Sequence, residues 1–278
     1  MQVDDQQVAQ KPRSNRWRWS LAAILMLTAS CDGSEGSETT VAASATTTVV
    51  ETSTTTTEAA TTTVSDPNSG PTVQDVMELE KFAPLEPGTY FIDPDSDPST
   101  PLRVVYEVPF EGWSQWFGAV KFAENTHIAI NITTVVNVVR DGCRDHSWAN
   151  PPVGPSVDDL AVALAELAPF RVTSAPEDVT MYGYHGKHLE LAAPDMHVEG
   201  EDFTGCVDGN LSSWVAPIDV AEGEGGAFHG YNAEPIEEFW ILDVEGTRLV
   251  IEANWSPASL PTDVAEMRAI LGSIRVEP

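Results

Sequence analysis

A threonine-rich stretch near the N-terminus most limits what this chain can fold into. Thirteen threonines lie between Thr39 and Thr63, separated only by small, acidic or valine residues, and residues 32–72 contain no lysine or arginine. Such a sequence cannot bury enough apolar surface to offset the entropy that is lost on ordering. We therefore predict a disordered, extended tether over 32–72, and a folded part that begins near residue 73.

Residues 73–278 have the length and composition of a folded unit. They number 206, a size compatible with one domain, and they contain six of the eight tryptophans. Two helices are predicted from apolar residues at helical spacing and from their caps: one follows Ser156 and ends before Pro169, and one follows Thr262. A third, shorter helix is predicted over Val73–Phe82.

Extended, β-branched or aromatic runs account for most of the remaining folded part. The predicted strands are Tyr90–Ile92, Leu102–Val108, Trp113–Phe122, Ile128–Val139, Ser273–Val276 and two hairpins, Asp178–Tyr182 with His185–Ala192 and Phe239–Leu242 with Arg248–Ala253. This order of elements predicts an α+β fold: an antiparallel β-sheet with helices packed on one face, in a single domain after the tether.

The first 31 residues contain the parts of an export signal. Four basic residues precede an apolar run, Leu21–Leu27, which is too short to span a bilayer and ends at the small residues Ala29 and Ser30 before Cys31. With Cys31 at the exit point, the segment resembles a bacterial lipoprotein signal, although Thr28 stands where that family usually has leucine. The resemblance implies cleavage before Cys31 and attachment of a lipid to its thiol, which would anchor the protein on the outer face of the cytoplasmic membrane.

The other two cysteines are Cys143 and Cys206. In an exported protein an even pair indicates a disulfide, and closing this loop should stabilise the fold by about 4 kcal/mol. Two metal thiolates are the alternative, but the close spacing that zinc sites use is missing.

Charge excludes one class of partner. Without residues 1–31 the chain has 10 lysines and arginines against 41 aspartates and glutamates. Such an acidic surface repels nucleic acid and anionic lipid. The acidity fits either general solvation or the binding of cations.

Two groups of residues are candidate sites. Asp93, Asp95 and Asp97 alternate as at the start of a calcium loop, but the glycine and glutamate that an EF-hand needs further on are absent, so a solvated turn is the alternative. Trp113, Trp116 and Phe117 lie in one predicted strand, with Trp113 and Phe117 on one face and Trp116 on the other. One of these two sets is a candidate carbohydrate- or lipid-contacting surface, and core packing is the alternative.

No motif for nucleophilic catalysis is present, and the many acidic residues make any carboxylate pair uninformative. Residues 100–278 resemble the PsbP/Mog1 superfamily in their order of elements and in the turn Gly183-Tyr184-His185-Gly186-Lys187, which opens a strand. That group includes actinobacterial lipoproteins of unknown activity, so the resemblance implies a fold and no catalytic residue or cofactor.

The leading hypothesis is therefore a non-enzymatic, lipid-anchored envelope protein whose folded domain binds an unidentified ligand or partner. The first alternative is a hydrolase of envelope polymers that uses acidic residues. The second is a structural or accessory subunit of a membrane complex.

Overall fold

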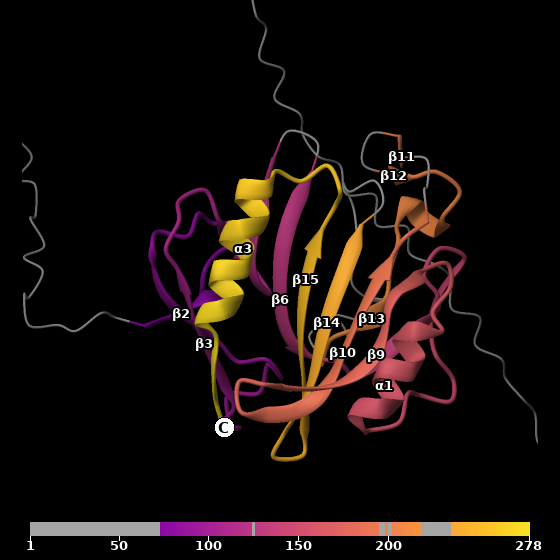
Figure 1. Cartoon of the computed structure of the whole chain (residues 1–278), viewed down its shortest axis with the longest axis horizontal. Coiled ribbons are helices and arrows are strands. Elements are labelled where there is room, and N and C mark those ends of the chain that lie inside the picture. Colours follow the sequence, from indigo (N-terminus) through magenta and orange to yellow (C-terminus); the bar gives the residue numbers. More distant parts are fainter. Residues whose placement is uncertain (1–72, 124–125, 195–197, 200–201, 218–234) are drawn as a thin grey trace, which may run out of the picture. The chain divides into compact units, whose positions relative to one another are not determined.

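The computed structural model describes residues 73–123, 126–194, 198–199, 202–217 and 235–278 (Figure 1). All of these belong to one unit, Thr63–Pro278. The predicted export signal with Cys31 and the predicted tether lie outside the described residues. Within the described part, no helix is long and apolar enough to cross a membrane.

The largest sheet is antiparallel and has seven strands in the order β4-β5-β6-β15-β14-β10-β9. In chain order these are β4 (Ser114–Trp116), β5 (Gly118–Phe122), β6 (His127–Thr134), β9 (Arg171–Met181), β10 (Tyr184–Ala192), β14 (Ile236–Val244) and β15 (Thr247–Trp255). Both predicted hairpins, β9–β10 and β14–β15, are present in this sheet.

Three smaller sheets and two helices complete the described fold. A four-stranded sheet consists of β1 (Gln74–Asp75), β2 (Gly88–Ile92), β3 (Arg103–Val108) and β16 (Arg275–Glu277), with only the β1–β2 pair parallel. A three-stranded sheet consists of β7 (Asn137–Asp141), β8 (Asp145–Trp148) and β13 (Trp214–Val215), and β11 (Val198–Glu199) pairs with β12 (Asp202–Phe203). The helices are α1 (Val157–Ala165) and α3 (Pro261–Ser273), with short 3-10 turns at Val76–Glu78 and Val207–Gly209.

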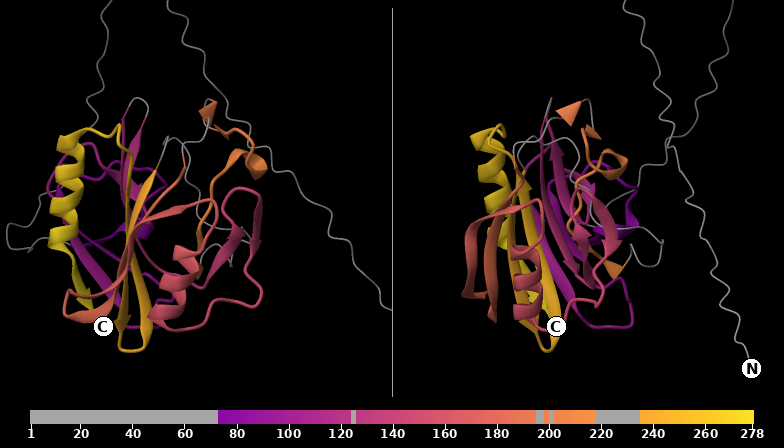
Figure 2. Two further views of the ribbon diagram at one scale, coloured as in Figure 1. Left: turned by 45° about the vertical axis from the view of Figure 1, so that its right-hand side comes forward. Right: turned by 90° about the vertical axis from the view of Figure 1, so that its right-hand side faces the viewer.

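The two helices cover opposite faces of the seven-stranded sheet. Helix α1 packs with Phe239 and Ile241, whereas α3 packs with Trp240 and Leu242. Successive residues of a strand point to opposite faces, so the helices lie on either side of β14, as the first view of Figure 2 shows. The antiparallel α+β class is confirmed, but the expectation that the helices share one face is not met. The cause is that β14 and β15 are apolar on both faces, which requires a cover on each side.

The predicted N-cap is confirmed for α1 and wrong for α3. Ser156 caps α1 in a capping box with Asp159. Of the predicted stripe of Val157, Leu160, Leu164 and Leu167, the three leucines are buried and Val157 is half-buried. Helix α3 begins at Pro261, with Leu260 as its N-cap, so the prediction that Thr262 is the cap is wrong. Proline is well suited to the first helical position, because the N–H that it lacks would have no helical partner there.

Three predicted elements differ in the structure. Residues 73–82 form the short strand β1 and a single 3-10 turn rather than a helix, because Asp75 caps the turn and Leu79 returns to an extended conformation. The predicted strand 113–122 is a hairpin of β4 and β5, and 128–139 is divided between β6 and β7.

Cys143 and Cys206 form the predicted disulfide. It joins the turn between β7 and β8 to the segment that leads into β13. Backbone hydrogen bonds continue the attachment, from Val207 N–H to the Cys143 carbonyl and from Ser212 N–H to the Gly142 carbonyl. The disulfide therefore holds the three-stranded sheet together, and Val138 and Trp214 of that sheet pack with Phe239 on the α1 side of the large sheet.

Candidate functional site

Four aromatic rings meet where β4 and β5 turn, and we call them the aromatic surface: Phe82, Trp116, Phe117 and Phe122. The Phe82 and Trp116 rings are stacked, with centroids 5.1 Å apart and an interplanar angle of 10°. Phe122 meets Phe82 edge to face at 5.3 Å, and Phe117 meets Trp116 in the same way at 5.1 Å. Phe82 is 39% exposed and Phe122 is 47% exposed, so this cluster faces solvent.

Phe82 is held in a conformation that a bulky residue rarely adopts. Its φ is 63°, in the left-handed region, which costs about 1–2 kcal/mol for a residue with a Cβ. The Phe82 N–H donates to both the backbone carbonyl and the side-chain Oε1 of buried Gln115, each at 3.2 Å. The Gln115 N–H in turn donates to the Ala83 carbonyl at 2.8 Å. These hydrogen bonds to the β4 strand keep a strained aromatic ring at the surface.

Lys81 supplies the positive charge of this surface. Its ammonium nitrogen lies 4.7 Å from the Trp116 ring centroid and 5.3 Å from that of Phe82. Because the two centroids are themselves 5.1 Å apart, the ammonium flanks the stacked pair. A cation so placed is attracted by both rings and still has N–H groups to offer a ligand.

The predicted trio of Trp113, Trp116 and Phe117 is divided by the structure. Trp113 is fully buried, and its indole N–H donates to Glu266 at 3.1 Å, so it belongs to the core. Trp116 and Phe117 both reach the surface, because the chain turns at Phe117 and strand alternation stops there.

Phe82, Phe122 and Lys81 are not predicted as site residues from the sequence. The sequence pattern places Phe82 in a predicted helix and Phe122 at the end of a single long predicted strand. A signal for the hairpin was available at Gly118, which lies directly opposite Trp116. A Cβ at Gly118 would lie 2.5 Å from the Ile130 carbonyl oxygen, so only glycine permits this close approach to β6.

Two glutamates are buried behind this surface, and we call Glu237 and Glu252 the acid pair. Both have no solvent exposure and occupy the α1 side of β14 and β15, two positions out of register with each other. Glu252 Oε2 accepts hydrogen bonds from the Trp214 indole at 2.8 Å and from the Asn131 amide at 3.1 Å. No pattern in the sequence distinguished this pair from the other acidic residues.

Burial raises the pKa of both acid-pair carboxyls. The pKa of Glu252 is raised to about 7, although hydrogen bonds from Trp214, Asn131 and Asn254 act to lower it. The pKa of Glu237 is raised well above its usual range by burial and by the charge of Glu252. Ionising both carboxyls would place two negative charges close together in a buried site, which is unfavourable. The pair therefore titrates as a unit and keeps a proton at neutral pH.

Phe117 connects the aromatic surface with the acid pair. Its ring contacts Trp116 on one side and lies edge to face with Trp214 on the other, with centroids 6.3 Å apart. Trp214 then donates to Glu252. The aromatic surface is therefore connected to the acid pair through Phe117 and Trp214.

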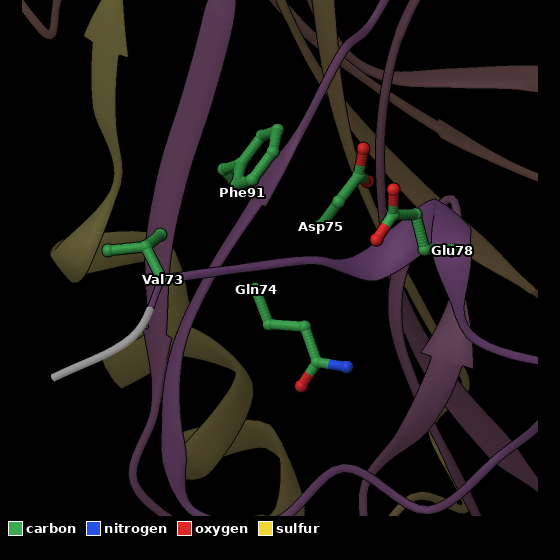
Figure 3. Close-up of a pocket in the computed structure, with 5 residues that line it drawn as sticks. All are labelled: Val73, Gln74, Asp75, Glu78 and Phe91. Atoms are coloured by element: carbon green, nitrogen blue, oxygen red, sulfur yellow. The ribbon is translucent and has the colours of Figure 1, made fainter. Parts of the chain in front are cut away.

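Two depressions of the described residues lie elsewhere. The first, of about 390 Å³, is lined by Val73, Gln74, Asp75, Glu78 and Phe91, which Figure 3 shows as sticks. The second, of about 520 Å³, contains Lys187, which pairs with Asp158 and Asp178. Neither depression includes the aromatic surface or the acid pair.

The three alternating aspartates form hydrogen bonds within their own turn. Asp95 accepts from the Asp97 N–H and from the Thr100 hydroxyl, and Asp97 accepts from the N–H and hydroxyl of Ser99. Burial raises the pKa of Asp93 to about 6, with a contribution from Asp95. Across the residues that the structure describes, no group of three or more His, Cys, Asp or Glu side chains is arranged to hold a metal ion.

Comparison of the chain with protein-family models, with curated proteins and with solved structures gives no match. The resemblance to the PsbP/Mog1 superfamily therefore stays a prediction.

The raised pKa values of the acid pair should make the stability of the folded state depend on pH. Its carboxyls bind protons more tightly in the folded state than in the unfolded chain, so the stabilisation is complete below about pH 4.5 and is lost as pH rises. Half-buried His127, whose pKa desolvation lowers to about 4, acts in the opposite direction, but only below its unfolded pKa of about 6.5. Between about pH 6.5 and 8 the free energy of unfolding should therefore fall, by about 1.4 kcal/mol per pH unit for each proton retained.

Glu237→Gln, which mimics the protonated acid, should fold and should reduce that slope. Urea unfolding of both proteins at several pH values measures it. An unchanged slope in the variant would show that the pair does not hold the proton.

Proposed function

We propose that the chain is a lipid-anchored protein of the cell envelope whose folded unit binds a ligand without chemical conversion, and that the aromatic surface is its binding site. The observation that carries this proposal is Phe82. A half-exposed phenylalanine in a left-handed conformation lowers stability, and such strain is concentrated at functional sites.

The construction around Phe82 supports a binding role. Gln115 fixes the backbone, Trp116 fixes the ring, and Phe122 and Lys81 lie beside it. Rigid aromatic anchors of this kind lose little conformational entropy when a ligand binds, so their contact area contributes efficiently to affinity.

The export signal supports the proposed location. Cleavage before Cys31 and lipidation of its thiol would leave residues 32–72 between the membrane and the folded unit. A diacylated cysteine carries two chains, which is enough for stable anchoring.

One observation favours a second function, hydrolysis of an envelope polymer. The acid pair supplies two carboxyls of different pKa, of which Glu252 titrates near neutrality, as acid–base catalysis requires. Both carboxyls are fully buried, however, and neither depression of the described residues reaches them. Binding therefore remains the better-supported function.

Variants of the aromatic surface test the binding role. The full chain is purified in detergent and sedimented with cell-wall material that detergent has freed of membrane. Phe82→Asn and Phe122→Ser should each weaken co-sedimentation at least about tenfold, because each removes an aromatic contact of about 1.5–3 kcal/mol.

Leu260→Ser is the matched control, since Leu260 is 57% exposed and lies outside the surface. It should bind like the parent chain. Equal binding by all four proteins, or no binding by any of them, would contradict the proposed site.

The anchor is tested separately by Cys31→Ala. Without the thiol no lipid can be attached, so a much smaller share of the protein should remain with membranes, and mass spectrometry of the parent chain should find a lipidated Cys31. A variant that stays equally membrane-bound would refute lipid anchoring.

A further inference from the structure

We propose that the ligand of the aromatic surface is a neutral saccharide, whose ring stacks on Phe82 beside Phe122 and whose hydroxyls accept hydrogen bonds from Lys81. This inference rests on the proposed binding function and adds the chemical class of the ligand.

The shape of the surface suits a sugar ring. Phe82 and Phe122 are 39% and 47% exposed, and their rings stand at 79° to each other, so the surface presents aromatic area in two orientations. Trp116 stacks on Phe82 at a 10° interplanar angle and holds its ring in place. The C–H groups of a pyranose form flat apolar faces that pack on exposed aromatic rings, while its hydroxyls project from the edge of the sugar ring, where polar groups can bind them.

The extent of the surface argues against a protein partner. A stable protein interface covers about 800 Å² on each side and involves about 20–30 residues. Here the exposed aromatic area comes from four residues, and Glu80 and Lys81, both exposed, directly precede Phe82 in the chain. A surface of a few rings matches one or two sugar units.

The charges of the chain and of Lys81 favour an uncharged ligand. Without residues 1–31 the chain has 41 acidic against 10 basic residues, and so it repels polyanions. A cationic ligand would be drawn to the chain, but at this surface the Lys81 ammonium already lies beside both stacked rings and would repel a second cation. A neutral ligand with hydroxyl groups avoids both conflicts.

The test treats the cell-wall material chemically before the sedimentation measurement. Periodate cleaves the bond between adjacent carbons that bear free hydroxyls and opens the sugar rings that have such a pair. Acid hydrolysis cleaves the glycosidic bonds of the remaining sugars, whereas protease removes proteins. A saccharide ligand predicts that Phe82-dependent binding is lost after periodate followed by acid hydrolysis and retained after protease. Binding should also change less than about twofold between 50 and 500 mM salt, because a neutral ligand forms no screened ion pair.

Binding that survives periodate followed by acid hydrolysis, or that is lost after protease, would overturn the saccharide assignment. A steep dependence on salt would overturn its neutrality. Phe122→Ser is measured alongside Phe82→Asn, and Leu260→Ser serves as the control. Absence of Phe82-dependent binding to untreated material would instead refute the proposed function, so the two failures are distinguishable.

Discussion

Burial of the β14–β15 hairpin on both faces is the constraint on which the described fold depends. Apolar side chains alternate toward α3 on one side and toward α1 on the other. Neither helix is wide enough to cover its face alone, and so the four-stranded sheet completes the α3 side and the three-stranded sheet completes the α1 side. The disulfide between Cys143 and Cys206 holds the second of these covers together.

The acid pair is a local exception within this apolar arrangement. Glu252 lies in one cross-strand row with Asn131, Gly118 and Trp116, which runs from the buried layer to the aromatic surface. Removing two carboxyls from water is unfavourable unless hydrogen bonds or a proton compensate. Trp214 provides one of those hydrogen bonds and also packs against Phe117, so the same side chain contacts both the acid pair and the aromatic surface.

The sequence predicted the parts of the fold that depend on local patterns. The stripe and cap of α1, the two hairpins and the pairing of the two folded-part cysteines follow from spacing and compartment alone. What it did not predict depends on contacts between distant segments. The opposite placement of the helices follows from burial on both faces of β14, and the acid pair is distinguished only by what covers it. At the candidate site, Trp116 and Phe117 were candidates from the sequence, but Phe82 stacks on Trp116 because its backbone is bound to Gln115, 33 residues away in the chain.

We propose that the fold keeps Phe82 strained and exposed for binding rather than for stability. The free energy of unfolding of Phe82→Asn tests this proposal, because asparagine tolerates the left-handed region. Relief of about 1–2 kcal/mol of strain should offset the lost ring stacking of about 0.5–1.5 kcal/mol. The free energy of unfolding of Phe82→Asn should therefore lie within about 1 kcal/mol of that of the parent chain. A loss of more than about 2 kcal/mol would contradict it, because Phe82 would then be a structural residue.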